Sequence, residues 1–322
     1  MGQSVKALER ALFLLKILNF APDFSLSISD LCNKCSFSLD ECFQTINAVT
    51  TLSPGLLSID NEFCRLNRAL EFLDGSGIYQ RVLGHGRVEV VPCLGSTNTV
   101  MLTKAKDLAC GDALFAEIQC AGRGRRGGRW DAGICTNITL SVAWRFQNIK
   151  KIEGLSCAVG LCSCRALQEY TNKTVTVKWP NDIYLEKGKL GGILIEFCNV
   201  GESVVAVIGL GVNVLGSTSN EEGGYERAGL VDDVKQNLRN EVAVALVNAI
   251  RSCCLHFEKE GLEPLLEDYA KCDRLAGHFV KITDGNRVYE GKVLGIDLVG
   301  NLQLNNNGEC LNIAAGHVEY LD

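Results

Sequence analysis

Three features that would point to other classes of protein are missing from this sequence. No apolar run among the 322 residues is long enough to span a bilayer. No segment near the N-terminus has the layout of a secretory signal peptide. Basic residues are not in excess: 32 stand against 38 acidic ones, a formal net charge of −6, so any strongly basic stretch is a local feature. We therefore expect a cytoplasmic protein without a membrane partner.

A complete set of metal ligands is also missing, although the chain has sixteen cysteines. Cys32 and Cys35 stand at zinc-knuckle spacing, but no second Cys or His pair follows at finger spacing. Cys253 and Cys254 fall in a predicted helix, where adjacent side chains do not converge on one metal. In a cytosolic protein, cysteines spread through apolar stretches are typically reduced and buried. We expect reduced thiols without zinc, and the sequence assigns the cysteines no further role.

The chain is long for one core, and its pattern predicts an α+β protein with domains at 1–66, 67–272 and 273–322. In the first domain, apolar spacing predicts helices, and a β-hairpin follows them. This order is the plan of a winged helix-turn-helix domain. The predicted helices cover 7–18, 31–35 and 38–49, and the hairpin strands cover 56–59 and 63–66. The predicted inward residues are Leu8, Leu12, Leu15, Ile46 and Val49, and the apolar face of the first helix is widened by Phe13, Leu14, Ile17 and Leu18.

The predicted recognition helix of this domain lacks basic residues. Residues 38–50 include Asp40 and Glu41 and no lysine or arginine. Phosphate contacts supply most non-specific DNA affinity, and lysine and arginine usually make them. Operator DNA and another protein therefore both stay open as partners of this domain.

The central segment alternates strands and helices irregularly, which predicts a mixed α/β sheet with its helices on one face. The predicted strands are 87–91, 114–119, 138–144, 175–178, 192–196 and 204–208. The predicted helices are one that ends at Cys110, then 154–170, 240–258 with Asn240 as N-cap, and 262–271. The last segment has short strands at 279–282, 289–296, 302–304 and 310–313, separated by hairpin-type turn residues. This pattern predicts an SH3-like β-barrel.

Residues 122–130 read Gly-Arg-Gly-Arg-Arg-Gly-Gly-Arg-Trp. Glycine lets the backbone approach a ligand closely, and arginine offers a planar fork of donors to a carboxylate or phosphate. The segment contains Gly-x-Gly-x-x-Gly, but the dinucleotide-binding form of that motif needs a helix directly afterwards, and residues 128–133 are poor helix formers. We reject the dinucleotide interpretation. An anion-binding loop and a solvated arginine-rich surface loop remain as interpretations.

A second polar cluster follows at 178–182 and 189–192. Asn181 and Asp182 place an amide and a carboxylate at a strand end, and Lys178 and Lys189 add two ammonium groups. A carboxylate among lysines, next to a phosphate-binding loop, suits Mg²⁺ with a nucleotide. The alternative is an ordinary charged β-hairpin without a binding role, which can contain all of these residues. Residues 96–98 and 209–213 offer further hydroxyl and amide groups at strand ends.

These motifs together resemble those of the biotin–protein ligases. The matching segments are 122–130, Lys-Trp-Pro-Asn-Asp at 178–182, Lys-Leu-x-Gly-Ile-Leu at 189–194 and Gly-Leu-Gly-Val-Asn at 209–213. The three-domain layout is similar to that of the bifunctional bacterial members, which also repress the biotin operon. The resemblance implies a catalytic domain of the class II synthetase type. Such a domain joins biotin to ATP as biotinyl-5′-AMP and then transfers biotin to a lysine of a carrier domain.

The resemblance also implies roles for single residues. Those expected to bind the biotin ring system are Ser96, Thr97, Asn98 and Gln119. Those expected at its carboxylate and the adenylate phosphate are Arg123, Gly124 and Arg125. Trp130 and Asn213 are expected to contact the adenine of ATP. The other residues expected at ATP are Lys178, Asn181, Gly192 and Asp182, and Asp182 is expected to hold Mg²⁺. The implied catalytic residues are Lys189, Arg125 and Asp182. The implied partners are a biotin carboxyl carrier protein of acetyl-CoA carboxylase, operator DNA, and a second copy of the chain when the adenylate is bound.

The sequence departs from the repressor members in the loop, where they usually carry further basic residues and this chain has Gly128, and in the acidic recognition helix. Two alternatives stay open. A lipoate– or octanoate–protein ligase has comparable chemistry, but its Arg-Arg-x-x-Gly-Gly-Gly pattern is absent. A metabolite-sensing regulator without ligase activity is the second alternative, and the presence of Lys189, Arg123 and Arg125 speaks against it.

Overall fold

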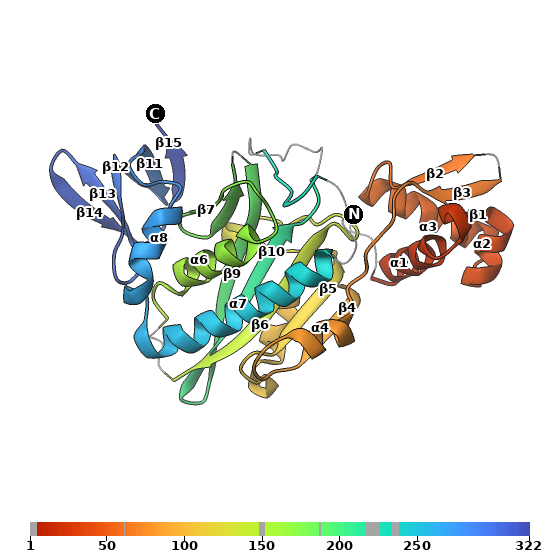
Figure 1. The fold of residues 1–322 in the computed structure, drawn as a ribbon, viewed down its shortest axis with the longest axis horizontal. Coiled ribbons are helices and arrows are strands. Elements are labelled where there is room, and N and C mark those ends of the chain that lie inside the picture. The colour runs from red at the N-terminus through yellow and green to blue at the C-terminus, as the bar shows by residue number, and fades with distance from the viewer. Residues whose placement is uncertain (1–4, 61, 148–151, 187, 217–225, 233–237) are drawn as a thin grey trace.

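The structure, a computed structural model, describes residues 5–60, 62–147, 152–186, 188–216, 226–232 and 238–322. In Figure 1 the N-terminal helices lie at one end of the molecule and the C-terminal strands at the other, with a large sheet between them. None of the helices in the described ranges is long and apolar enough to cross a membrane. All sixteen cysteines are free thiols, nine of them are buried, and Cys310 is exposed.

The N-terminal part contains three helices and a three-stranded sheet in the order β1-β3-β2. Serine caps start two of the helices: Ser27 accepts a hydrogen bond from Asp30 N, and Ser38 forms a capping box with Glu41. The predicted helices and hairpin are present, and Leu8, Leu12, Leu15, Ile46 and Val49 are buried, whereas Phe13 of the predicted apolar face is exposed. The sequence missed β1, which has only three residues. The elements are α1 (Val5–Asn19), β1 (Ser25–Ser27), α2 (Ile28–Cys35), α3 (Leu39–Leu52), β2 (Leu57–Asp60) and β3 (Phe63–Leu66).

The central sheet has seven strands in the order β4-β5-β6-β10-β9-β8-β7. β4 pairs in parallel with β5, and the other neighbours pair antiparallel, so the sheet is mixed as predicted. Residues 209–213 do not lie beyond the last strand, as the sequence suggested, but continue it. The strands are β4 (Val88–Leu94), β5 (Ala113–Gln119), β6 (Asn137–Phe146), β7 (Val175–Lys178), β8 (Asp182–Leu185), β9 (Gly188–Val200) and β10 (Ser203–Asn213).

Helices cover both faces of this sheet, so the prediction of a single covered face was wrong. α6 (Leu155–Gln168) and α7 (Leu238–Glu260) pack on the face that carries Phe115 and Leu140. α5 (Thr97–Thr103) packs Met101 against the opposite face. Alternation along each strand explains this, because successive side chains point to opposite faces and both faces are apolar here.

Two predicted helix ends were also wrong. α5 ends at Thr103 rather than Cys110, and a 3-10 turn, Ala105–Asp107, follows it. Beyond that turn, the buried Asp112 accepts a hydrogen bond from Ala109 N. Asn240 lies inside α7 and does not cap it. The carboxylate of Glu71 takes that role and accepts hydrogen bonds from the backbone N–H groups of Arg239 and Asn240. A short helix that the sequence missed, α4 (Gly75–Arg81), precedes β4.

The C-terminal part is a five-stranded antiparallel sheet in the order β14-β13-β12-β11-β15. The predicted helix 262–271 is a 3-10 turn, Glu263–Leu265, followed by α8 (Leu266–Cys272). β15 was not predicted, and it returns the chain to the edge of β11. The strands are β11 (Phe279–Asp284), β12 (Arg287–Ile296), β13 (Leu302–Asn306), β14 (Glu309–Ile313) and β15 (His317–Tyr320).

Candidate active site

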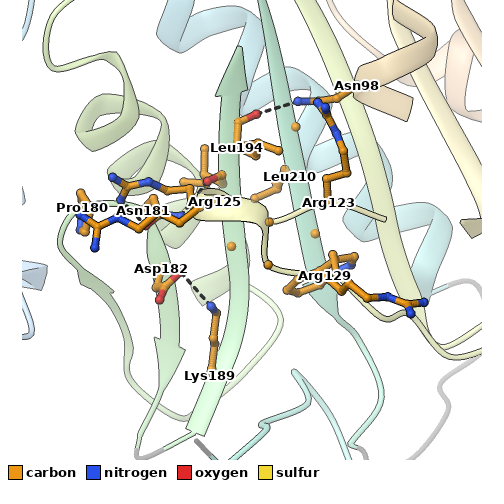
Figure 2. Close-up of a pocket in the computed structure, with 18 of the residues that line it drawn as sticks. Asn98, Arg123, Arg125, Arg129, Pro180, Asn181, Asp182, Lys189, Leu194 and Leu210 are labelled. Atoms are coloured by element: carbon orange, nitrogen blue, oxygen red, sulfur yellow. Dashed lines mark hydrogen bonds and ion pairs between the residues drawn. The ribbon is translucent and has the colours of Figure 1, made fainter. Parts of the chain in front are cut away.

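A cavity of about 460 Å³ opens between the ends of β9 and β10, the arginine-rich segment 122–130 and the C-terminal strand β15. Figure 2 shows several of its side chains. It brings together almost all residues that the sequence singled out: Ser96, Thr97, Asn98, Gln119, Arg123, Gly124, Arg125, Trp130, Lys178, Asn181, Asp182, Lys189 and Gly192. Asn213 is outside its lining. Gly316, His317 and Val318 line it as well, and the sequence gave no sign of them.

The segment 122–130, called the arginine loop from here on, folds back on itself as a small hairpin. Trp130 N donates to Gly122 O at 3.0 Å, and Gly124 N donates to Gly128 O at 2.7 Å. A Cβ atom at Gly122 would lie 2.2 Å from the carbonyl oxygen of Trp130, so only glycine fits there. The glycines therefore allow close backbone approach, and they leave the arginines on the outside of the hairpin.

The four arginines of the loop contact four different partners. Arg123 forms an ion pair with Glu196 of β9. Arg125 donates to Oδ1 of Asn181 at 2.9 Å, and burial lowers the pKa of its guanidinium, with the positive charge of Arg126 adding to this effect. The remaining pairs are Arg126 with Asp284 at 3.1 Å and Arg129 with Asp131 at 3.5 Å.

One wall of the cavity is a network of neutral hydrogen-bonding groups around the start of α5. The buried hydroxyl of Ser141 lies 2.7 Å from Oγ1 of Thr97 and 2.6 Å from Oδ1 of Asn98. Asn98 Nδ2 donates to Leu194 O at 3.0 Å, and Thr97 N donates to the side-chain oxygen of Gln119 at 2.7 Å. Sequence reasoning missed Ser141. Its signal was one of two hydroxyls, those of Thr139 and Ser141, in the otherwise apolar strand 138–144.

Two charged residues face each other at the other end of the cavity. Lys189 Nζ lies 3.0 Å from Oδ1 of Asp182, and both side chains are about one-quarter exposed (24% and 26%). They come from neighbouring strands β9 and β8 and point toward one another in Figure 2. Asn181 is fixed beside them because its Nδ2 donates to Ile193 O at 2.9 Å. The geometry thus places one cation and one anion next to Arg125 and its amide partner.

Lys178 and Trp179 join this site to the C-terminal sheet. Lys178 Nζ donates to Val318 O at 3.1 Å, and Trp179 Nε1 donates to Gly300 O at 2.9 Å. Lys178 is 7% exposed, and this burial lowers the pKa of its ammonium group. The predicted ATP-site lysine therefore lines the cavity while its ammonium holds a backbone carbonyl of β15.

Trp130 and Asn213, the two predicted adenine contacts, are placed differently. Trp130 lies against Gly211: a Cβ atom there would be 2.3 Å from the indole. The buried Nε1 of Trp130 has no hydrogen-bond partner among the described residues. Asn213 is buried at the end of β10, where its Oδ1 accepts from Asn137 Nδ2 at 2.7 Å and its Nδ2 donates to Lys189 O at 3.3 Å. Its side chain thus supports the backbone of Lys189.

The donor set available to a metal is small. Within the described ranges no three His, Cys, Asp or Glu side chains are grouped so that they could hold an ion. Asp182 offers one carboxylate at the cavity. Mg²⁺ is commonly held by one or two carboxylates together with substrate phosphates and water. Asp182 therefore fits a metal that arrives with a nucleotide, and it does not fit a resident all-protein metal site.

The comparisons with known proteins agree with this geometry. Residues 90–213 match the biotin/lipoate A/B protein ligase family. The bifunctional ligase/repressor BirA of Salmonella typhimurium is 36% identical over 76% of this chain and 77% of its own length. The biotin–[acetyl-CoA-carboxylase] ligase of Mycobacterium tuberculosis is 32% identical over 77% of this chain and 96% of its own length. The chain belongs to the biotin/lipoate A/B protein ligase family.

A solved structure supports the fold. The biotin protein ligase of Aquifex aeolicus, solved in complex with biotin and ATP, matches with a TM-score of 0.60 over 72% of this chain and 97% of its own. The two sequences are 23% identical. The chain is thus a mixed α/β protein with a catalytic domain of the biotin-ligase fold and a strand-rich C-terminal part.

Proposed function

We propose that this protein is a biotin–protein ligase that makes biotinyl-5′-AMP from biotin and ATP and then transfers biotin to a lysine of a biotin carboxyl carrier domain. The observation that carries the proposal is the convergence of Arg125, Asp182 and Lys189 on one cavity. The family membership and the names of the relatives from Salmonella and Mycobacterium support it. The acetyl-CoA carboxylase in the Mycobacterium name makes a carrier domain of that enzyme the proposed acceptor.

Biotin is proposed to bind with its ring system against the neutral hydrogen-bonding wall. Thr97, Asn98 and Gln119 present amide and hydroxyl groups there, as the resemblance implied for them and for Ser96. Buried polar groups need partners, so a head group with both donors and acceptors suits this wall better than a purely apolar one. The carboxylate of biotin would then extend toward Arg123 and Arg125.

Adenylation brings a carboxylate to a polyphosphate, so like charges must be neutralised while the reactants are held in line. Lys189 and Arg125 are proposed to supply positive charge at the carboxylate and the α-phosphate. Asp182, together with phosphate oxygens, would hold Mg²⁺, which neutralises charge on the triphosphate. In the transfer step Asp182 is proposed to help the acceptor lysine lose its proton. No covalent intermediate with the enzyme is required, so none of the cysteines has a catalytic role.

The nucleotide is proposed to lie between the arginine loop and the C-terminal strand β15. Trp130 would cover the adenine, close to Gly192, and Asn181 would stand beside the phosphates. Lys178 is proposed to act near ATP, with its ammonium held by Val318 O. Asn213 remains the proposed hydrogen-bond partner of adenine, although its side chain is engaged with Asn137 and Lys189.

For the flanking parts we propose a winged helix-turn-helix domain at 1–66 and an SH3-like barrel at 273–322, with the catalytic domain at 67–272. The first rests on three helices followed by the β2–β3 hairpin, and the second on the five-stranded C-terminal sheet. The ligase/repressor relative supports operator DNA as a second partner, with a dimer formed on adenylate binding. The exposed face of α3 speaks for weak DNA affinity, since it presents Leu39, Asp40 and Phe43 and no basic residue.

The deciding experiment gives the purified protein ATP, Mg²⁺ and one acid at a time: biotin, lipoate or octanoate. Pyrophosphate release with biotin, followed by biotinylation of a carrier domain, is the expected result. Release with lipoate alone would establish the second acid specificity of the family instead. Release with none of the three would favour a regulator without ligase activity. A gel shift with operator DNA, run with and without biotin and ATP, tests the repressor role separately.

A further inference from the structure

The arginine loop touches the C-terminal sheet through a residue that the proposed chemistry does not use. Arg126 Nη2 lies 3.1 Å from Oδ1 of Asp284, and Nη1 donates to Thr283 O at 3.4 Å. Both acceptors belong to β11. We infer that Arg126 and Asp284 form a latch, the Arg126–Asp284 latch, that holds the arginine loop closed against the C-terminal sheet and so prolongs retention of the adenylate. Arg126 is thereby a positioning residue.

The backbone of the loop aims two neighbouring arginines at two different domains. Arg126 adopts φ 53° and ψ 33°, in the left-handed region, and Gly127 follows with φ 78°. This turn sends Arg125 to Asn181 at the cavity and Arg126 to β11. A non-glycine residue in this region carries a conformational cost that its contacts must offset. The contacts of Arg126 with Asp284 and Thr283 offset this conformational cost.

The C-terminal side of the latch is continuous with the cavity wall. Thr283 pairs with His317 of β15, and His317 and Val318 line the cavity. Val318 O in turn accepts the hydrogen bond from Lys178. The loop, β11, β15 and the segment around Lys178 thus form a closed ring of contacts around the cavity. Opening the latch releases one side of this ring and leaves the contact of Lys178 in place.

The expected strength of the latch is modest. The two side chains are about half exposed (48% and 46%), so the pair is solvated and screened by salt. Exposed pairs of this kind change an equilibrium or a rate by roughly 1.5- to fivefold. We therefore expect faster release of the adenylate in latch variants, an effect that fades at high salt, and little change in the rate at which the adenylate forms.

This inference rests on the proposed ligase function, and the test keeps the two apart. The full-length protein and three variants, Arg126→Glu, Asp284→Arg and the double exchange, are loaded with biotin and ATP. Labelled biotinyl adenylate is then chased with unlabelled adenylate. Each single variant should release it about two- to fivefold faster, and the double exchange should restore the original rate to within about twofold. Asp131→Asn, which breaks the ion pair between Arg129 of the loop and the residue that follows the loop, should leave the release rate unchanged.

Amide hydrogen exchange of residues 122–130 in the free protein gives a second readout that does not depend on ligase activity. The latch predicts faster exchange there in both single variants and recovery in the double exchange. If the parent protein forms no adenylate, the proposed function fails, and the exchange data still decide the latch. Single variants that keep the parent release and exchange rates, or effects that simply add in the double exchange, would overturn the latch.

Discussion

Lys189 and Asp182 form an ion pair, Nζ to Oδ1 3.0 Å, between neighbouring strands at the floor of the cavity. The pair joins the residue proposed to act on the biotin carboxylate and α-phosphate to the residue proposed to hold the metal. In the absence of substrate charge, each neutralises the other. Binding of ATP and Mg²⁺ would offer both of them new partners, so the pair is pre-positioned for charges that develop during the reaction.

Replacing Lys189 by Ala should abolish most adenylate formation while the protein stays folded. Loss of one preorganised donor at a developing charge typically lowers the rate by about 10²–10³-fold. Biotin-dependent pyrophosphate release measures the effect, and a thermal melt checks the fold. Lys173→Ala, which removes a surface partner of Asp232, serves as the matched control and should behave like the parent protein. Normal turnover of the Lys189 variant would rule out its assigned role.

Replacing Arg125 by Ala should let the adenylate leave before transfer. The variant loses the hydrogen bond to Asn181 and a partly desolvated positive charge beside the cavity. A hydrogen bond to a charged group contributes on the order of 1.5–3 kcal/mol, so release should accelerate by about tenfold or more. The released adenylate acylates lysines without selection, so biotinylation of a bystander protein such as albumin is the measurement. An adenylate that stays bound as tightly as in the parent protein would contradict the prediction.

Removing one partner of the buried pair of Arg239 and Glu117 should strongly destabilise the central part of the protein. Its atoms are 2.8 Å apart, and the two side chains are 3% and 5% exposed. Arg239→Met leaves the Glu117 carboxylate buried and unpaired, which costs about 3–5 kcal/mol of unfolding free energy. Arg81→Met removes an exposed pair with Glu241 and should cost no more than about 1 kcal/mol. Urea unfolding of both variants checks the difference, and equal losses would refute it.

Asp273 should make the protein less stable as the pH rises. Burial raises the pKa of its carboxyl group from 3.8 to about 6, and its buried Oδ2 has no hydrogen-bond partner among the described residues. The folded state therefore binds a proton that the unfolded state has already lost between about pH 4 and 6. The stability that the neutral carboxyl group contributes is fully present below the unfolded pKa of 3.8. It is lost as the pH rises through the folded pKa of about 6.

Asp273→Asn should remove this loss. Asn keeps an oxygen for the hydrogen bond that Asp273 accepts from Leu275 N at 2.9 Å. At pH 7 the variant should exceed the parent protein in unfolding free energy by on the order of 2 kcal/mol, and at pH 4 the two should converge. Thermal melts across this range provide the measurement. A variant that is less stable at pH 7 than the parent would contradict the assignment.

The parts of the site that local motifs carry could be predicted from the sequence. The arginine loop and residues 178–192 each hold several functional groups within a short stretch, and the glycines at 209 and 211 leave room for Asn98 and Trp130. The contribution of β15 could not be predicted. Lys178 Nζ donates to the backbone carbonyl of Val318, which lies 140 residues away in the sequence. Because a backbone carbonyl is present at every residue, this contact has no recognisable sequence pattern.

The errors in the fold have similar causes. Asn240 was predicted as an N-cap because asparagine is a common capping residue. The group that caps α7 is the carboxylate of Glu71, and local sequence could not reveal it because it lies 169 residues away. The chain beyond α5 is held by the buried Asp112, which accepts hydrogen bonds from Ala109 N and from Arg87 N, 25 residues away. The helices were predicted on one face of the sheet, and this was wrong because the order of strands and helices along the chain does not determine on which face each helix packs.

The capping of α7 by Glu71 has a consequence for protein engineering. Glu71 follows the N-terminal helices and β-hairpin, and Leu70 just before it is held by Asn19 of α1, whose Oδ1 accepts from Leu70 N at 2.7 Å. One short stretch thus connects to α1 through Leu70 and caps α7 through Glu71. A shortened enzyme or a grafted DNA-binding module has to keep residues 70–74 intact. A truncation that starts the chain after residue 74 would remove the N-terminal helices and also the Glu71 cap of α7.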